Sequence, residues 1–146
     1  MEQINQNSTK VKKIKLDFKD SKYATGRRKR SIANVWVKKG SGNIHVNGLK
    51  MNEYFKRPVH QIIVTRPLEI TEATNNYDIK CSVKGGGLSG QAGAIILGIS
   101  KALIAHDVSM KKNLKKDKLT TRDSRVVERK KYGHRKARRS FQFSKR

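Results

Sequence analysis

The sequence predicts a small α/β domain followed by a basic tail, and three observations support this. Residues 90–106 carry apolar side chains at helical spacing, on a surface broad enough to be buried against a sheet. Residues 31–37 and 77–83 have the β-forming composition or the alternation that is typical of strands. The length of 146 residues fits one domain with a single modest core.

The strand pattern predicts a β-hairpin early in the chain. Residues 31–37 form its first strand, the segment KKGSGN forms a tight turn, and Ile44–Val46 forms the return strand. Residues 77–83 form a third strand, on which Cys81 is a small buried side chain. Because Cys81 is the only cysteine, it cannot form an intramolecular disulfide, which fits a reducing compartment.

The helix pattern is clearest at residues 90–106, where Ser89 is a candidate N-cap. Proline suits the first turn of a helix and disrupts its interior, so a second helix is expected from Pro58 through Val64, with Pro67 closing it. The other expected elements are a short helix over residues 49–55, a basic connector over 110–119 and a short edge strand over 124–131.

Charge is high and unevenly placed. The chain holds 35 Lys and Arg against 11 Asp and Glu, a net charge of +24, whereas solubility needs only about 2–8. Such an excess favours a dense anionic partner, most commonly RNA or DNA. No acidic residue follows Glu128. We therefore divide the chain into an N-terminal extension (1–21) expected to be disordered, a globular body (22–128) and an extended basic tail (129–146).

Residues 85–90, GGGLSG, match the dinucleotide-binding pattern G-x-G-x-x-G. The second parallel strand of a βαβ unit does not follow, however, and Gln91 and Ala92 occupy the positions where a phosphate-binding P-loop needs Lys and Ser or Thr. Glycines still allow close backbone approach, and the N-terminus of a helix attracts anions. We favour a contact with an RNA backbone phosphate over a purely structural turn.

The sequence contains no recognisable catalytic or metal-binding arrangement. No two of its four histidines lie at metal-ligand spacing, and no acidic residues pair as acid and base. We expect no enzymatic activity, cofactor, metal or small-molecule substrate. No apolar run is expected to reach the length of a membrane span, so we expect no membrane contact. The alternatives are a chromatin-type DNA binder, an RNA-modifying enzyme and a cationic membrane-active protein.

Five segments in order resemble the small-subunit ribosomal protein nine family in its bacterial or organellar form, and they cover the chain from Tyr23 onward: residues 23–42, 85–95, 121–133, 135–139 and 142–146. The resemblance implies a four-stranded sheet with helices packed on one face and a left-handed βαβ crossover. It also implies a structural role in the small ribosomal subunit, with binding to ribosomal RNA in the head beside neighbouring ribosomal proteins. The expected location is the bacterial cytoplasm or, alternatively, a mitochondrial ribosome.

The expected ribosomal-RNA contacts are the basic residues of these segments together with the glycine loop: Arg27, Arg28, Lys29, Arg30, Lys84, Gly85, Gly86, Gly87, Gln91, Arg122, Arg125, Arg129, Lys130, Lys131, Arg135, Lys136, Arg138 and Arg139. The resemblance further implies that the terminal Ser144, Lys145 and Arg146 approach the peptidyl-site transfer RNA. Many family members have a proline where this chain has Phe141. Phe141 and Phe143 are expected either to contact RNA or to anchor the tail onto the body.

Overall fold

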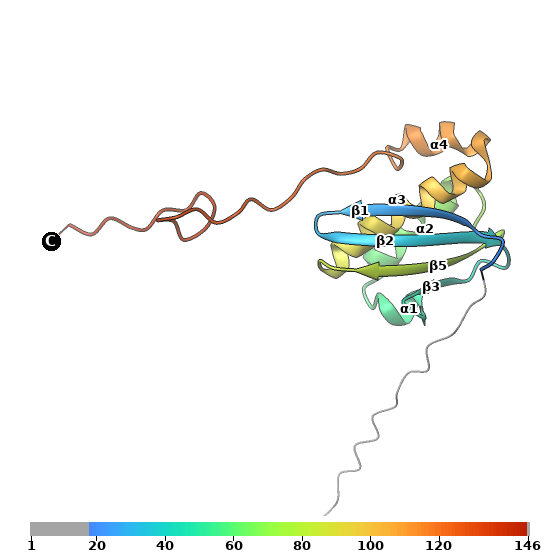
Figure 1. Cartoon of the computed structure of the whole chain (residues 1–146), viewed down its shortest axis with the longest axis horizontal. Coiled ribbons are helices and arrows are strands. Elements are labelled where there is room, and N and C mark those ends of the chain that lie inside the picture. The colour runs from blue at the N-terminus through green and yellow to red at the C-terminus, as the bar shows by residue number, and fades with distance from the viewer. Residues whose placement is uncertain (1–17, 146) are drawn as a thin grey trace, which may run out of the picture.

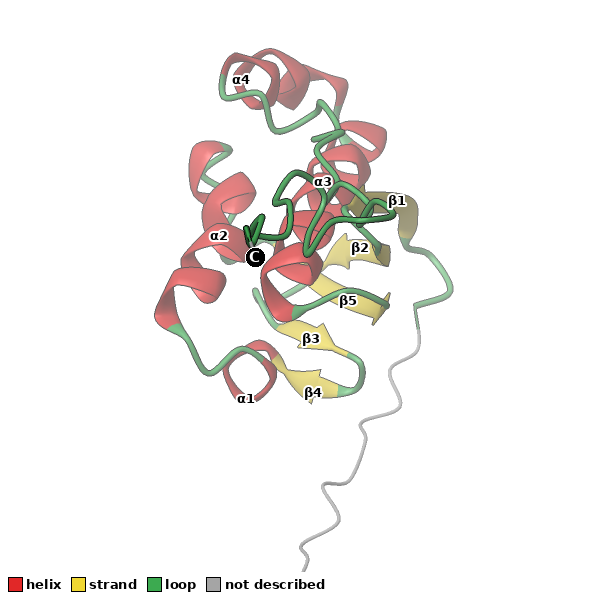
Figure 2. Ribbon diagram, turned by 90° about the vertical axis from the view of Figure 1, so that its left-hand side faces the viewer, coloured by secondary structure: helices red, strands yellow, loops and turns green. Residues whose placement is uncertain are grey.

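The computed structural model describes residues 18–145 as a two-layer body from which the C-terminal segment extends (Figure 1). Five strands form one sheet in the order β1-β2-β5-β3-β4, and helices α2 and α3 cover one of its faces (Figure 2). In chain order the elements are β1 (Lys22–Arg28), β2 (Ser31–Lys39), β3 (Ile44–Val46), β4 (Leu49–Lys50), α1 (Met51–Tyr54), α2 (Pro58–Ile70), β5 (Tyr77–Lys84), α3 (Leu88–His106), a 3₁₀ turn (Val108–Met110) and α4 (Lys111–Lys116).

Strand β1 was not predicted from the sequence. It pairs antiparallel with β2 through a tight turn at Lys29, whose φ is +52°. Only Ala24, Gly26 and Arg28 point toward the helical layer, so β1 has no run of β-branched or aromatic residues on its inner face. Gly26 lets α3 approach closely, because a Cβ there would meet the backbone oxygen of Ala94. The position of β1 therefore depends on the close approach of its backbone to α3 and not on an apolar pattern in its sequence.

The predicted hairpin between β2 and β3 is wrong. Strand β5 lies between them, antiparallel to β2 and parallel to β3. The connecting loop passes over the end of β5 and is fixed by Asp78, whose Oδ1 accepts hydrogen bonds from the backbone N–H groups of Ser41 (3.0 Å) and Asn43 (2.9 Å). A strand 31 residues further along the chain supplies this pairing, so a local turn signal could not predict it.

The sheet has five strands where four were expected. The additional strand β4 pairs with β3 through a turn in which Asn47 (φ +52°) and Gly48 (φ +84°) both adopt the left-handed conformation that favours Asn-Gly hairpins. Asn47 also bonds Val83 with its side chain, accepting from its N–H at 2.8 Å and donating to its oxygen at 3.0 Å. Parallel strands β3 and β5 are joined through α1 and α2, which is the expected βαβ connection; its left-handed sense stays a prediction.

Helix α3 is the centre of the core. Ile95, Ile99 and Leu103 are fully buried and belong to one apolar cluster with Val35 of β2 and Ile79 of β5. The helix has 19 residues and contains an 18-residue window with a mean hydropathy of 1.5, so by length and composition it could cross a membrane, contrary to our expectation. Since 61% of that apolar window is buried inside the body, the composition is that of a core helix.

Two further helix predictions need correction. Helix α2 continues past Pro67 to Ile70, because Pro67 and Leu68 are buried and their packing offsets the cost of about 3 kcal/mol for an interior proline. The backbone oxygen of Pro67 accepts hydrogen bonds from the N–H (3.3 Å) and hydroxyl (2.9 Å) of Thr71. The expected connector after α3 contains helix α4, whose Leu114 is fully buried.

Candidate nucleic-acid interface

The β1–β2 turn and the glycine loop lie against each other. The hydroxyl of Ser31, just after the turn, donates to the backbone oxygen of Gly85 at 3.1 Å. Gly85 (φ +75°) and Gly86 (φ +60°) adopt left-handed conformations, and a Cβ on Gly85 would lie 2.6 Å from the backbone oxygen of Arg30. The glycines are therefore required both by the bend and by the close approach of the basic turn.

The glycine loop leads directly into α3. The N-cap is Gly87, without a side-chain cap, so the predicted cap at Ser89 is wrong. Gln91 instead fixes the loop: its Nε2 donates to the Gly85 oxygen at 3.2 Å, and its Oε1 accepts from the Tyr54 hydroxyl at 2.8 Å. Gln91 thus has a structural role in this loop, and its predicted RNA contact remains a prediction.

The segment where the body passes into the tail completes a basic groove. We use this name for the hollow bordered by three segments that are distant in sequence: Lys29–Arg30, Gly86–Gly87 and Val126–Lys130. Lys84 is exposed at the end of β5, next to the glycine loop. Because the glycines have no side chains, a phosphate can come close to their backbone N–H groups, and the neighbouring arginines and lysines supply positive charge. The groove can therefore hold part of a nucleic-acid backbone.

Beside this groove, an ion-pair cluster holds the segment that leads into the tail against the body. Asp123 Oδ2 lies 3.3 Å from Arg28 Nη2 and 2.9 Å from Arg125 Nη2. Arg125 also donates to Asp123 through Nε (3.0 Å) and its backbone N–H (3.1 Å). These hydrogen bonds, together with the positive charges of Arg125 and Arg28, hold the pKa of Asp123 below its usual range and raise the pKa of Arg125.

No strand is formed between Arg125 and residue 145, the last described residue, so the predicted edge strand over 124–131 is wrong. The segment instead runs extended, with Val127 82% exposed. Without a neighbouring strand its backbone has no ladder to join, and its two valines are too few to bind it to the body.

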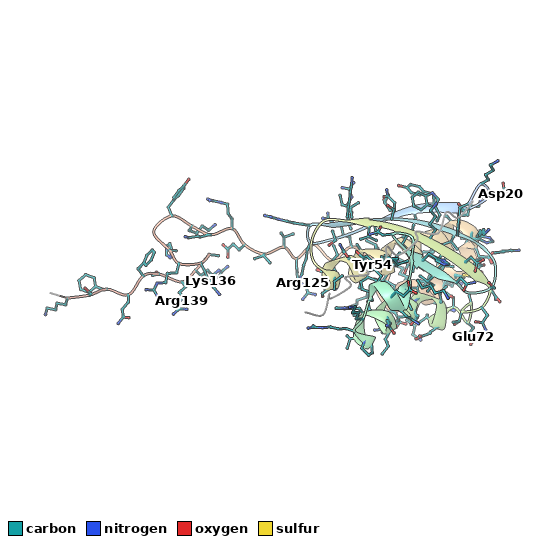
Figure 3. All side chains as sticks on the ribbon, turned by 90° about the horizontal axis from the view of Figure 1, so that it is seen from below. Asp20, Tyr54, Glu72, Arg125, Lys136 and Arg139 are labelled. Carbon is teal, nitrogen blue, oxygen red and sulfur yellow. The ribbon has the colours of Figure 1, made fainter. Side chains whose placement is uncertain are left out.

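Residues 134–140 form a compact loop within the tail. His134 and Ser140 pair in an antiparallel bridge, and the Arg135 N–H donates to the Arg139 oxygen at 2.7 Å. Glu128 lies 3.5 Å from Lys131 Nζ and 3.0 Å from Arg138 Nε, so one carboxylate serves two cations. Figure 3 shows Lys136 and Arg139 on this loop, well away from the body, with Arg125 at the base of the tail.

The tail aromatics do not anchor onto the body. Tyr132 is 91% exposed and Phe143 is 88% exposed. Arg129 lies over the Tyr132 ring at 5.7 Å and Arg135 lies over the Phe141 ring at 5.5 Å, both within the tail itself. Phe141 and Phe143 therefore do not pack on the body, and their contact with RNA stays a prediction.

The structure gathers Lys29, Arg30, Gly86, Gly87, Arg129 and Lys130 around the basic groove, with Lys84 next to it. Arg27 and Arg28 line a neighbouring hollow with Asp123, to which Arg125 is bonded. The contact predicted for Arg122 stays a prediction, and Lys131 and the later cations belong to the tail. Arg146 lies outside the described residues. Sequence reasoning missed Ser31, Asp123 and Glu128, which fix this arrangement. The available signal was that Asp123 and Glu128 are the only acidic residues after position 117.

Among residues 18–145, no group of three or more His, Cys, Asp or Glu side chains is placed to hold a metal ion.

The ribosomal protein S9/S16 family model matches residues 26–146. The chain belongs to the ribosomal protein S9/S16 family. This confirms the resemblance that the five segments indicated. S9/S16 proteins are non-enzymatic, RNA-binding structural components of the small ribosomal subunit that function in translation beside neighbouring ribosomal proteins. Membership therefore associates this chain with the ribosome.

Proposed function

We propose that this chain binds small-subunit ribosomal RNA in the head of the subunit, with the basic groove and the tail as its contact surface. The single observation that carries this proposal is the convergence of the β1–β2 turn, the glycine loop and Val126–Lys130 on one hollow. Asp123 and Glu128 are each shared between two cations, so neither presents an unbalanced negative charge to a phosphate.

The tail extends this surface beyond the body. Its loop at residues 134–140 projects Arg135, Lys136, Arg138 and Arg139 from a short segment without any acidic residue. Arginine binds phosphate bidentately, and lysine acts as a point charge, so the loop is suited to a folded RNA backbone. The extended path between body and loop allows contacts with RNA segments that the body itself does not reach (Figure 1).

We further propose that Ser144, Lys145 and Arg146 contact the peptidyl-site transfer RNA during translation. The support is the family resemblance and the exposed position of Ser144 and Lys145 at the far end of the tail. The neighbouring proteins of the head are expected partners of the body, and the bacterial cytoplasm is the proposed location, with a mitochondrial ribosome as the alternative.

Sedimentation of an extract from the source cells tests the ribosomal assignment. The chain should migrate with the small subunit and move to the top of the gradient after RNase treatment, whereas DNase should have no effect. Migration that DNase abolishes would refute the assignment.

A deletion of Ser144–Arg146 tests the transfer-RNA contact. Particles with this deletion should assemble normally but bind peptidyl-site transfer RNA more weakly. Replacing Arg135 and Arg138 with Gln is the matched control, which should weaken incorporation into the subunit. Normal transfer-RNA affinity after the deletion would contradict this part of the proposal.

A further inference from the structure

Within residues 18–145, which the structure describes, no helix covers the face of the sheet opposite α2 and α3 (Figure 2). One row of side chains crosses this face in register through all five strands: Tyr23, Trp36, Lys80, His45 and Lys50. Side chains alternate between faces along a strand, and the neighbours of Trp36 in β2, Val35 and Val37, are fully buried on the helical side. The row therefore belongs to the open face.

Two aromatic rings lie at the β1 end of this row. The ring centroids of Tyr23 and Trp36 are 5.3 Å apart with planes inclined at 45°, and Tyr23 is 51% exposed. Lys80 Nζ lies 5.8 Å from the Trp36 centroid and 5.9 Å from the centroid of Phe18, and Lys38 Nζ lies 4.9 Å from the Phe18 centroid. A cross-strand aromatic pair stabilises a sheet by itself. Here Tyr23 also presents ring surface toward solvent, and Trp36 beside it is half-buried.

The open face is continuous with the basic groove. Beyond the aromatic row come the register row Thr25, Asn34 and Ser82, and then the row Arg27, Ile32 and Lys84. The last row ends beside the β1–β2 turn and the glycine loop. Asp78 is the only acidic residue in the five strands, and its Oδ1 accepts hydrogen bonds from the loop at Ser41 and Asn43. Positive charge and aromatic surface thus run together toward the groove.

We propose that this open face is a second RNA site, which holds an unpaired RNA segment by stacking bases on Tyr23 and Trp36. Lys80 beside Trp36, together with the exposed Arg27 and Lys84 of the neighbouring row, supplies positive charge near the phosphates of the same segment. Aromatic side chains with interleaved cations bind single strands because every unpaired base offers a ring face, whereas the bases of a duplex are already stacked. The proposal rests on the proposed RNA-binding function and adds to it a distinct surface and a preferred RNA structure.

Trp36 is the only tryptophan in the chain, so its fluorescence reports this site directly. The full chain is titrated at 50 mM salt with a 12-nucleotide oligouridylate, a 12-base-pair RNA duplex and inorganic polyphosphate. We expect the single strand to quench Trp36, and the duplex and polyphosphate to bind with little quenching. Equal quenching by polyphosphate would overturn the proposal, because it would mean that charge alone causes the signal.

The variant Tyr23→Leu tests the stacking, with Ile62→Ala on α2, an exposed apolar residue on the other side of the sheet, as the control. Anisotropy of a labelled oligouridylate should show that Tyr23→Leu lowers the affinity roughly 5- to 150-fold. This is the loss expected when one base no longer stacks on an aromatic ring. Lys80→Gln should weaken single-strand binding without changing the protein's circular dichroism. An unchanged affinity in a folded Tyr23→Leu protein would refute the site.

A tail variant separates this proposal from the proposed function. Replacing Arg135, Lys136, Arg138 and Arg139 with Gln should weaken binding to naked ribosomal RNA, while oligouridylate should still quench Trp36. If the chain fails to bind ribosomal RNA but keeps single-strand quenching, the proposed function fails and the open-face site stands. If Trp36 responds to neighbouring small-subunit proteins and not to oligouridylate, the face is a protein contact and the proposal is wrong.

Discussion

Arg28 in β1 and Asp123 in the segment that leads into the tail form an ion pair, with a separation of 3.3 Å between Nη2 and Oδ2. The side chains of both are about a quarter exposed, at 28% each. This pair links the strand that ends at the basic turn to the segment that borders the basic groove. The Asp123 carboxylate therefore holds the segment that leads into the tail against β1.

The carboxyl group of Asp123 should titrate below its ordinary pKa of about 3.9. Hydrogen bonds from Arg125 stabilise the carboxylate most, and the charges of Arg125 and Arg28 add to this. A depressed pKa in the folded chain means that the contact contributes to stability above the unfolded pKa and is lost as the pH falls through the folded pKa. NMR titration of the side-chain carboxyl carbon measures this midpoint directly.

Two arginine variants sharpen this titration. Arg125→Gln should raise the midpoint of Asp123 toward its ordinary value, because Arg125 donates the side-chain hydrogen bonds to this carboxylate. Arg28→Gln should raise the midpoint less, because Arg28 acts on the carboxylate through its charge alone. A midpoint in the native chain equal to that of an unfolded peptide would contradict the observed geometry.

Gly26 should not tolerate a side chain. A Cβ at this position would meet the backbone oxygen of Ala94 and lie 2.6 Å from the backbone nitrogen of Gly98, and neither group can move without shifting α3. We expect Gly26→Ala to lower the free energy of unfolding by about 1–3 kcal/mol, as overpacking generally does. Urea denaturation followed by circular dichroism measures this change.

Gly87→Ala is the matched control for Gly26→Ala. A Cβ at Gly87 would meet nothing within 4 Å, and its φ of −107° is ordinary for any residue. The free energy of unfolding should fall by less than about 1 kcal/mol, the difference between glycine and alanine at a helix N-cap. Equal destabilisation by the two substitutions would argue against close packing of β1 on α3.

The tail loop should dominate the salt dependence of RNA binding. Changing Arg135, Lys136, Arg138 and Arg139 to Gln should flatten the slope of log affinity against log salt by roughly 3–4, because each released phosphate contact contributes about 0.7–0.9. Filter binding to naked small-subunit ribosomal RNA between 50 and 200 mM salt measures the slope.

Helix α4 provides a control with the same charge change. Its Lys111, Lys112, Lys115 and Lys116 lie at the opposite end of the body from the tail loop (Figure 1), so changing them to Gln should alter the slope by less than about 1. Similar slopes for the two fourfold variants would show that total charge matters and the tail loop does not.

Cys81 should report unfolding. It is fully enclosed between the sheet and the helices, and this burial raises the pKa of its thiol well above the ordinary range. An unfolded chain ionises this thiol near pH 8.5, so its contribution to stability is intact at lower pH and declines as the pH rises above that value. Iodoacetamide should label the native chain slowly and the urea-unfolded chain rapidly; equal rates would contradict the burial.

The sequence by itself determined the elements whose signals are local. Apolar spacing at Ile95, Ile99 and Leu103 predicted α3, and alternation predicted β5, because burying one helix face or one strand face leaves a periodic pattern. Charge distribution predicted the basic tail, and five ordered segments identified the family. Each of these properties can be read along the chain without knowledge of its neighbours in space.

Only the tertiary structure decided which strands pair and where the cations gather. Strand β5 separates β2 from β3, β1 is placed by the close approach of Gly26 to α3, and Val126–Lys130 returns to the β1–β2 turn. These are contacts between residues far apart in sequence, and their strength depends on burial, backbone proximity and charge pairing, which no local pattern encodes. The open-face row from Tyr23 to Lys50 follows from the same register, so it appears only once the strand order is known.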